Sequence, residues 1–187
     1  MNAKLAILFF VATFGFSLPA LFEFNDFQVP NWQQGYEPEQ PVPYSHRLHA
    51  GTLGIDCQYC HTGADESRHA TIPNLSTCMN CHEYGKVDGK TQEAYDNIQH
   101  LRDAWEKKEP IRWVRVHNLQ DFVYFNHSTH VRVAGFDCEQ CHGDMTTRGV
   151  ARQEESLTMG WCVNCHRDEN EKRGNERAPL GCDSCHR

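Results

Sequence analysis

Cys57-Gln-Tyr-Cys60-His61 is one of five copies of the phrase Cys-x-x-Cys-His in this chain of 187 residues. The copies contain all ten cysteines: Cys57, Cys60, Cys78, Cys81, Cys138, Cys141, Cys162, Cys165, Cys182 and Cys185. The histidines that close them are His61, His82, His142, His166 and His186. This phrase is the attachment signature of c-type haem.

The spacing has a chemical reason, because two thiols can form thioethers with the haem vinyl groups while the next residue offers an imidazole to the iron. Zinc is the rival interpretation, since two Cys-x-x-Cys pairs can close a tetrahedral four-sulfur site. Zinc explains the cysteines but not the histidine after every pair. With 12 histidines in 187 residues, five such coincidences have odds of roughly one in a million. We therefore expect five covalently bound haem c groups.

The composition fits a fold that is built around cofactors. The mean hydropathy is -0.67, and beyond residue 22 the chain is poor in Leu, Ile and Val. Side-chain burial alone would not offset the conformational entropy of such a segment. We expect mostly loops and short α-helices around stacked haems with little sheet, and no stable fold without haem. The net charge of -7 and the lack of a basic run exclude a nucleic-acid partner.

Residues 5–22 carry no charge and follow Lys4. As a helix of 1.5 Å per residue they would span about 27 Å, close to the hydrocarbon thickness of a bilayer. A cleaved signal usually has a shorter apolar stretch of about 7–15 residues, and residues 18–22 match a cleavage site poorly. We expect residues 1–22 to be one transmembrane helix, with an unprocessed signal as the alternative. Because c-type haem is attached outside the cytoplasm, we expect the remainder to lie on the periplasmic face of the bacterial inner membrane.

The chain contains an internal duplication. Tyr44-Ser-His46-Arg-Leu-His49 precedes the Cys57 phrase by seven residues, and Phe125-Asn-His127-Ser-Thr-His130 precedes the Cys138 phrase by seven. Such a repeat indicates two related units. The predicted division is a tether (23–43), a first dihaem module (44–82), a connecting helix and extended segment (83–124), a second dihaem module (125–166) and a fifth-haem segment (167–187). Thr91 and Pro110 bound the connecting helix, and residues 111–117 follow it in extended form.

Seven histidines remain as distal iron ligands: His46, His49, His69, His100, His117, His127 and His130. The repeated His-x-x-His pair resembles that of the tetrahaem class III cytochromes. By that resemblance His46 serves the Cys57 haem, His127 serves the Cys138 haem, and His49 and His130 reach other haems. His69 and His117 compete for the fifth position, with Met159 as a further candidate. His100 lies on the polar face of the connecting helix, which favours a solvated role.

Longer phrases extend the resemblance over most of residues 35–186. They are Ser67-Arg-His-Ala-Thr-Ile-Pro73, Cys78-Met-Asn-Cys-His82, Trp113-Val-Arg-Val-His117 and Met159-Gly-Trp-Cys-Val-Asn-Cys-His166. In these phrases the chain resembles the pentahaem cytochrome subunit of alternative complex III, a bacterial quinol oxidase module. The resemblance implies an iron–sulfur subunit and quinol-oxidising integral membrane subunits as partners. The acceptor would be a monohaem cytochrome c or a terminal oxidase.

The expected function is electron transfer through the haems, with no catalytic residue in this chain. One alternative is a multihaem reductase, which needs an iron with an open position. All five phrases end in histidine, and the distal candidates outnumber the irons. A second alternative is a stand-alone, membrane-anchored quinol dehydrogenase, which a single anchor and a short tether permit.

Overall fold

The computed structural model describes residues 33–186, which form short helices joined by long loops. In chain order the helices are η2 (Arg47–Thr52), α2 (Cys57–Cys60), α3 (Leu75–His82), α4 (Gln92–Lys107), η3 (Thr129–Val133), α5 (Glu139–His142), η4 (Met145–Thr147), α6 (Met159–Arg173) and α7 (Cys182–Cys185). Within this described range, β-pairing is limited to an isolated bridge between Val123 and His186. The expectation of short helices and loops with little sheet is confirmed.

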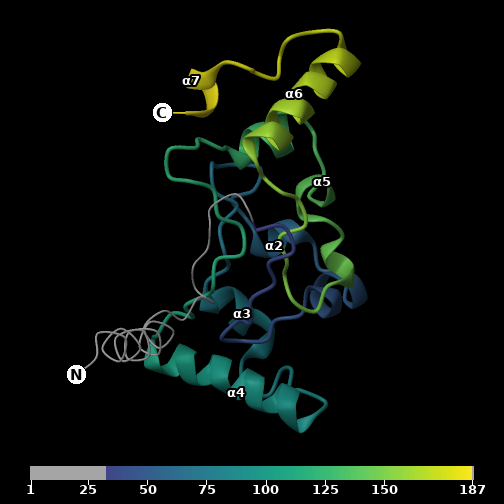
Figure 1. Cartoon of the computed structure of the whole chain (residues 1–187). Helices are drawn as coiled ribbons and strands as arrows, with labels where there is room; N and C mark the ends of the chain where they lie inside the picture. Colours follow the sequence, from purple (N-terminus) through teal and green to yellow (C-terminus); the bar gives the residue numbers. More distant parts are fainter. Residues whose placement is uncertain (1–32, 187) are drawn as a thin grey trace, which may run out of the picture.

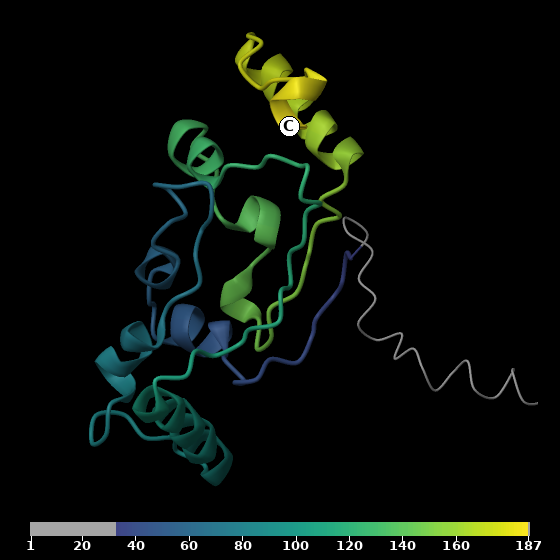
Figure 2. The ribbon, with the colours of Figure 1, turned by 90° about the vertical axis from the view of Figure 1, so that its left-hand side faces the viewer.

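The helices that carry the cysteine phrases follow one another along the molecule. Figure 1 shows α3 and α4 at one end, α2 and α5 in the middle, and α6 with α7 at the other end. Figure 2, from the side, shows the same separation between the α3–α4 end and the α6–α7 end. The five phrases are therefore distributed from end to end instead of gathering in one cluster.

The duplicated sequence gives a duplicated local structure. η2 and η3 are both π-helical turns that carry the second histidine of a His-x-x-His pair. A glycine with positive φ ends each turn, Gly54 at +65° and Gly135 at +76°, and this conformation favours glycine because it has no Cβ. The residue after each glycine donates its N–H to the carbonyl of His49 or His130, at 3.0 and 3.1 Å.

α4 confirms the predicted connecting helix. The Thr91 hydroxyl caps its start by accepting the Ala94 N–H at 3.1 Å, and Lys108 ends it in the left-handed conformation before Pro110. α4 packs against α3. The segment that follows has no regular hydrogen-bonded structure at residues 111–115; the Gln40 side chain holds it by bonding both the N–H and the carbonyl of Val114.

Very little apolar side chain is buried. Among the described residues the buried hydrophobic side chains are Ala64, Met79 and Leu101, while Leu53 and Ile72 are 60% and 59% exposed. A domain of this size needs a substantial apolar core to offset its chain entropy. Large apolar plates held between the loops would supply that missing core.

Residues 33–186 contain no helix that is long and apolar enough to cross a bilayer. The predicted anchor at 1–22 and the first ten residues of the predicted tether lie outside the described residues. The anchor therefore stays a prediction.

Candidate haem-binding sites

Four pairs of histidine rings face one another across the molecule. Each pair joins one candidate distal histidine to a histidine that closes a cysteine phrase. The ring centroids are 6.5 Å apart for His46 and His61, 6.1 Å for His49 and His82, 6.5 Å for His127 and His142, and 6.2 Å for His130 and His166. Thus the first histidine of each His-x-x-His pair faces the first phrase of its module, and the second histidine faces the second phrase of the same module.

These distances fit one iron ion between the two rings of each pair. A metal ion lies about 2 Å from the imidazole nitrogen that binds it, and so about 3 Å from the ring centroid. Two rings on opposite sides of one ion therefore have centroids about 6 Å apart. The described residues include all ten cysteines and none of them forms a disulfide bond, so both sulfurs of every phrase are available for thioether links. The two cysteines and the histidine of each phrase, with a second imidazole facing four of these histidines, fit haem c.

The surroundings of the two His-x-x-His pairs are nearly identical. The Tyr44 ring meets His46 edge-on at 4.9 Å and stacks on His49 at 4.4 Å. In the second module Phe125 meets His127 edge-on at 4.9 Å and stacks on His130 at 4.5 Å. One aromatic ring in each module therefore fixes the orientation of both histidines, which explains why an aromatic residue precedes both pairs.

Hydrogen bonds fix the other edge of most of these rings. Five histidines donate Nδ1–H to backbone carbonyls at 2.6–2.9 Å: His49 to Ser45, His61 to Thr71, His127 to Arg68, His130 to Asn126 and His166 to Pro179. Such bonds fix the tautomer, leave Nε2 free for a metal and raise the basicity of the ligand. Thr71 has a φ of +68°, an uncommon conformation for a β-branched residue, at the position whose carbonyl accepts from His61.

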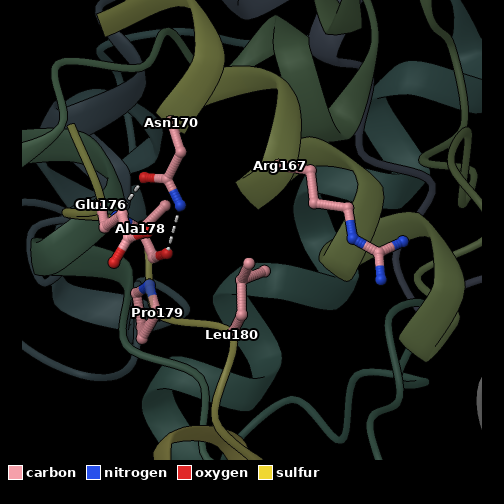
Figure 3. A pocket seen from close by; sticks show the side chains of 6 residues that line it. All are labelled: Arg167, Asn170, Glu176, Ala178, Pro179 and Leu180. Atoms are coloured by element: carbon pink, nitrogen blue, oxygen red, sulfur yellow. Dashed lines mark hydrogen bonds between the residues drawn. The ribbon is translucent and has the colours of Figure 1, made fainter. Parts of the chain in front are cut away.

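The His166 acceptor is held by a loop that is fastened to α6. The Asn170 side chain bonds both the carbonyl and the N–H of Ala178 at 2.8 Å (Figure 3). This bond pair places the Pro179 carbonyl 2.6 Å from His166 Nδ1. A pocket of about 310 Å³ lies between this loop and Arg167.

Neighbouring thiols show which phrases lie side by side. Burial and then the Cys60 thiol raise the pKa of Cys78. Burial and then the adjacent Cys57 thiol raise the pKa of Cys138. The first and third phrases therefore lie side by side.

The same relation continues toward the other end of the molecule. Burial, followed by Cys165 and Cys162, raises the pKa of Cys141 to about 11. Burial and then Cys185 raise the pKa of Cys162. The spatial order of the phrases is thus second, first, third, fourth, fifth, in agreement with the order of α3, α2, α5, α6 and α7 along Figure 1.

Comparisons with known proteins agree with this geometry. The model of the family "Cytochrome c7 and related cytochrome c" matches residues 123–187, and the model of the class III cytochrome c family matches residues 24–110. Both parts of the chain are thus similar to families of multihaem c-type cytochromes. A curated relative is the multihaem cytochrome c subunit of menaquinone reductase from Nitratidesulfovibrio vulgaris (strain Hildenborough). It is 25% identical over 170 residues, covering 81% of this chain and 78% of the relative.

The fifth phrase is held by the segment before the second module. Val123 forms the isolated bridge with His186, and the Tyr124 N–H donates to the Cys185 carbonyl at 2.6 Å. Arg68 donates from Nε to the Phe125 carbonyl at 3.2 Å and stacks over the Tyr124 ring at 4.4 Å. The loop that contains His69 therefore lies against the segment that holds the fifth phrase.

The remaining predicted ligands differ in their surroundings. His69 is exposed, as is His100 on α4, and the Met159 side chain is 68% exposed at the start of α6. His117 is half-buried, and its Nε2 lies 3.2 Å from Nδ1 of His142. Burial lowers the pKa of His117 to about 4, and burial followed by His117 lowers the pKa of His142 to about 3. Both rings are therefore neutral near pH 7.

Sequence reasoning missed the buried charged residue Arg102. It is 2% exposed, and its guanidinium donates to the carbonyls of His82 at 2.7 Å, Glu83 at 3.2 Å and Val87 at 3.1 Å. It also forms an ion pair with Asp88 at 2.7 Å. The sequence offered one sign that Arg102 is buried: it follows Leu101, which belongs to the apolar stripe of α4.

Proposed function

We propose that this cytochrome is a pentahaem electron-transfer subunit of a membrane-bound quinone oxidoreductase of the alternative complex III type. The observation that carries the proposal is the set of four facing imidazole pairs at 6.1–6.5 Å. When bound, each haem supplies a one-electron couple. Iron held between two histidines has no open position for a substrate, so this arrangement favours electron transfer over a reductase reaction.

We assign the ten cysteines and the five phrase-closing histidines to five covalently attached haems. His46, His49, His127 and His130 are the proposed distal ligands of the first, second, third and fourth haems. For the fifth haem we propose His69, because its loop lies against the segment that holds His186. The other candidate, His117, already accepts a hydrogen bond from His142 with its Nε2, so that nitrogen is not free to bind iron.

The order of the phrases gives the proposed path. Haems held by the five phrases would carry electrons between the second phrase, which ends α3 beside α4, and the fifth phrase in α7, through the first, third and fourth phrases. The protein sets the spacing and the potentials through ligands, burial and hydrogen bonds. The relative's role in a menaquinone reductase supports a menaquinone-type partner complex in the membrane.

Two measurements on the isolated full chain test the electron-transfer assignment. We expect mass spectrometry to show five haems, and the reduced protein to bind no carbon monoxide because every iron has two axial ligands. Fewer haems, or carbon monoxide binding at one or more irons of the parental protein, would contradict the assignment. His69→Ala should create one carbon monoxide site, whereas exposed His100→Ala should create none.

The partner assignment needs a separate test. A tagged chain purified from native membranes should bring with it an iron–sulfur subunit and integral membrane subunits, and only that complex should exchange electrons with menaquinol. If the chain purifies alone and oxidises quinol unaided, it is instead the stand-alone dehydrogenase. Reduction of the haems by menaquinol or by a periplasmic cytochrome would establish the direction of flow.

A further inference from the structure

His117 lies directly behind the phrase-closing histidine of the third phrase. Its Nε2 is 3.2 Å from His142 Nδ1, and the two rings meet edge-on, with centroids 4.5 Å apart and planes at 87°. On its other side His142 faces His127, with the planes only 3° from parallel. His142 therefore has one nitrogen toward the proposed iron and the other toward His117.

We propose that His117 is a positioning residue, not an iron ligand, and that it orients His142 and strengthens its bond to the third haem. The inference rests on the proposed function, because it requires iron between His127 and His142. In a neutral His142 the Nδ1–H donates, so His117 accepts with Nε2 and carries its own proton on Nδ1. That bond occupies the only acceptor nitrogen of His117.

This contact differs from those of the other anchored rings. The five other Nδ1 donors bond to backbone carbonyls, which substitution of the acceptor residue does not remove. The acceptor of His142 is a side chain, and so it can be removed or replaced. An outer partner of this kind raises the basicity of the ligand and thereby favours the ferric state.

The position of this contact gives it a particular effect on electron transfer. The third phrase lies between the first and the fourth, because Cys138 adjoins Cys57 and Cys141 adjoins Cys165. An electron handed along the phrases in this order would therefore cross the haem that His142 holds and His117 tunes. A low potential in the middle of the path would keep electrons from resting there.

The test is a spectroelectrochemical titration of the full holoprotein, with the third haem identified by its assigned haem-methyl resonances. His117→Ala should raise the potential of that haem by about 59 mV, a tenfold change for one electron, with five haems retained and no carbon monoxide binding. His117→Gln keeps an acceptor oxygen and should recover at least half of the shift. His100→Ala is the matched control and should leave all five potentials unchanged.

Three results would overturn the inference. They are unchanged potentials in His117→Ala, a shift of equal size in His117→Gln, and the appearance of a high-spin haem that binds carbon monoxide. The last would make His117 an iron ligand. Failure of the proposed function is recognised separately, because it would appear in the parental protein as a wrong haem count.

Discussion

Arg102 places a buried positive charge beside the second haem site, and this charge should raise the potential of that haem. The guanidinium bonds the backbone carbonyl of His82, the phrase-closing histidine of that site, at 2.7 Å. It is 2% exposed, whereas its partner Asp88 is 50% exposed. Since water screens the carboxylate far more than the guanidinium, a net positive charge acts on the site.

The size of the effect follows from Coulomb's law. If the guanidinium and the iron are separated by roughly 8 Å, their interaction is worth about 2 kcal/mol for each unit of charge at an effective dielectric constant of 20. If Asp88 offsets about half of this, roughly 1 kcal/mol remains, which is about 40 mV for a one-electron couple. Arg102→Gln should therefore lower the potential of the second haem by about 40 mV, and Asp88→Asn should raise it by a similar amount.

The second haem can be followed on its own. The ring planes of His49 and His82 are 59° apart, against 8°, 29° and 3° in the other three pairs. Low-spin ferric haem with ligand planes far from parallel gives a more anisotropic spin-resonance signal than haem with near-parallel planes. A redox titration monitored on that signal measures the second haem directly.

Two further variants separate charge from structure. Arg102→Lys keeps the charge but loses the forked hydrogen bonds, so its potential should stay near the parental value even if the protein is less stable. Exposed Arg177→Gln removes a positive charge from the opposite end of the molecule and should leave the signal unchanged. If Arg102→Gln and Asp88→Asn shift the potential in the same direction, or neither shifts it, the electrostatic reasoning is wrong.

Three other predictions concern ligation, pH and folding. His49→Ala should leave the second haem five-coordinate, seen as one high-spin haem that binds carbon monoxide; a fully low-spin spectrum would contradict the pairing with His82. Glu154 forms ion pairs with Arg152 and Arg148. Its pKa is lowered below 4.5, mainly by the hydrogen bond from Arg152. Its stabilisation is present above pH 4.5 and is lost as the pH falls through the folded pKa, so the melting temperatures of Glu154→Gln and the parental protein should converge in acid. Polypeptide made without haem attachment should show no cooperative thermal transition by circular dichroism, and a cooperative one would refute a haem-built core.

The sequence predicted the features that depend on local spacing. The capping residue Thr91 and the breaker Pro110 bounded α4 correctly, and the His-x-x-His repeat corresponds to two matching turns in the structure. Local patterns were sufficient here because a cap, a turn and an attachment phrase each involve residues only a few positions apart.

Long-range placement was not readable from the same patterns. Nothing near Cys57 in the sequence indicates that it adjoins Cys138, and nothing near His117 indicates that it lies behind His142. Arg102 was missed for a related reason. A charged residue on a helix is usually solvated, and only the packing of α4 on α3 reveals that this one is buried against backbone carbonyls.

The pairing of rings also suggests which histidines contribute most to stability. His46 and His127 face the first phrase of their modules, whereas His49 and His130 face His82 and His166 in the second phrase, at more than twice the separation along the chain. A metal that bridges a longer loop removes more conformational entropy from the unfolded chain, by about 0.6 kcal/mol for each doubling of the loop. The second histidine of each pair therefore ties the second haem site of its module to the first, and its loss should destabilise the module more than the loss of the first histidine.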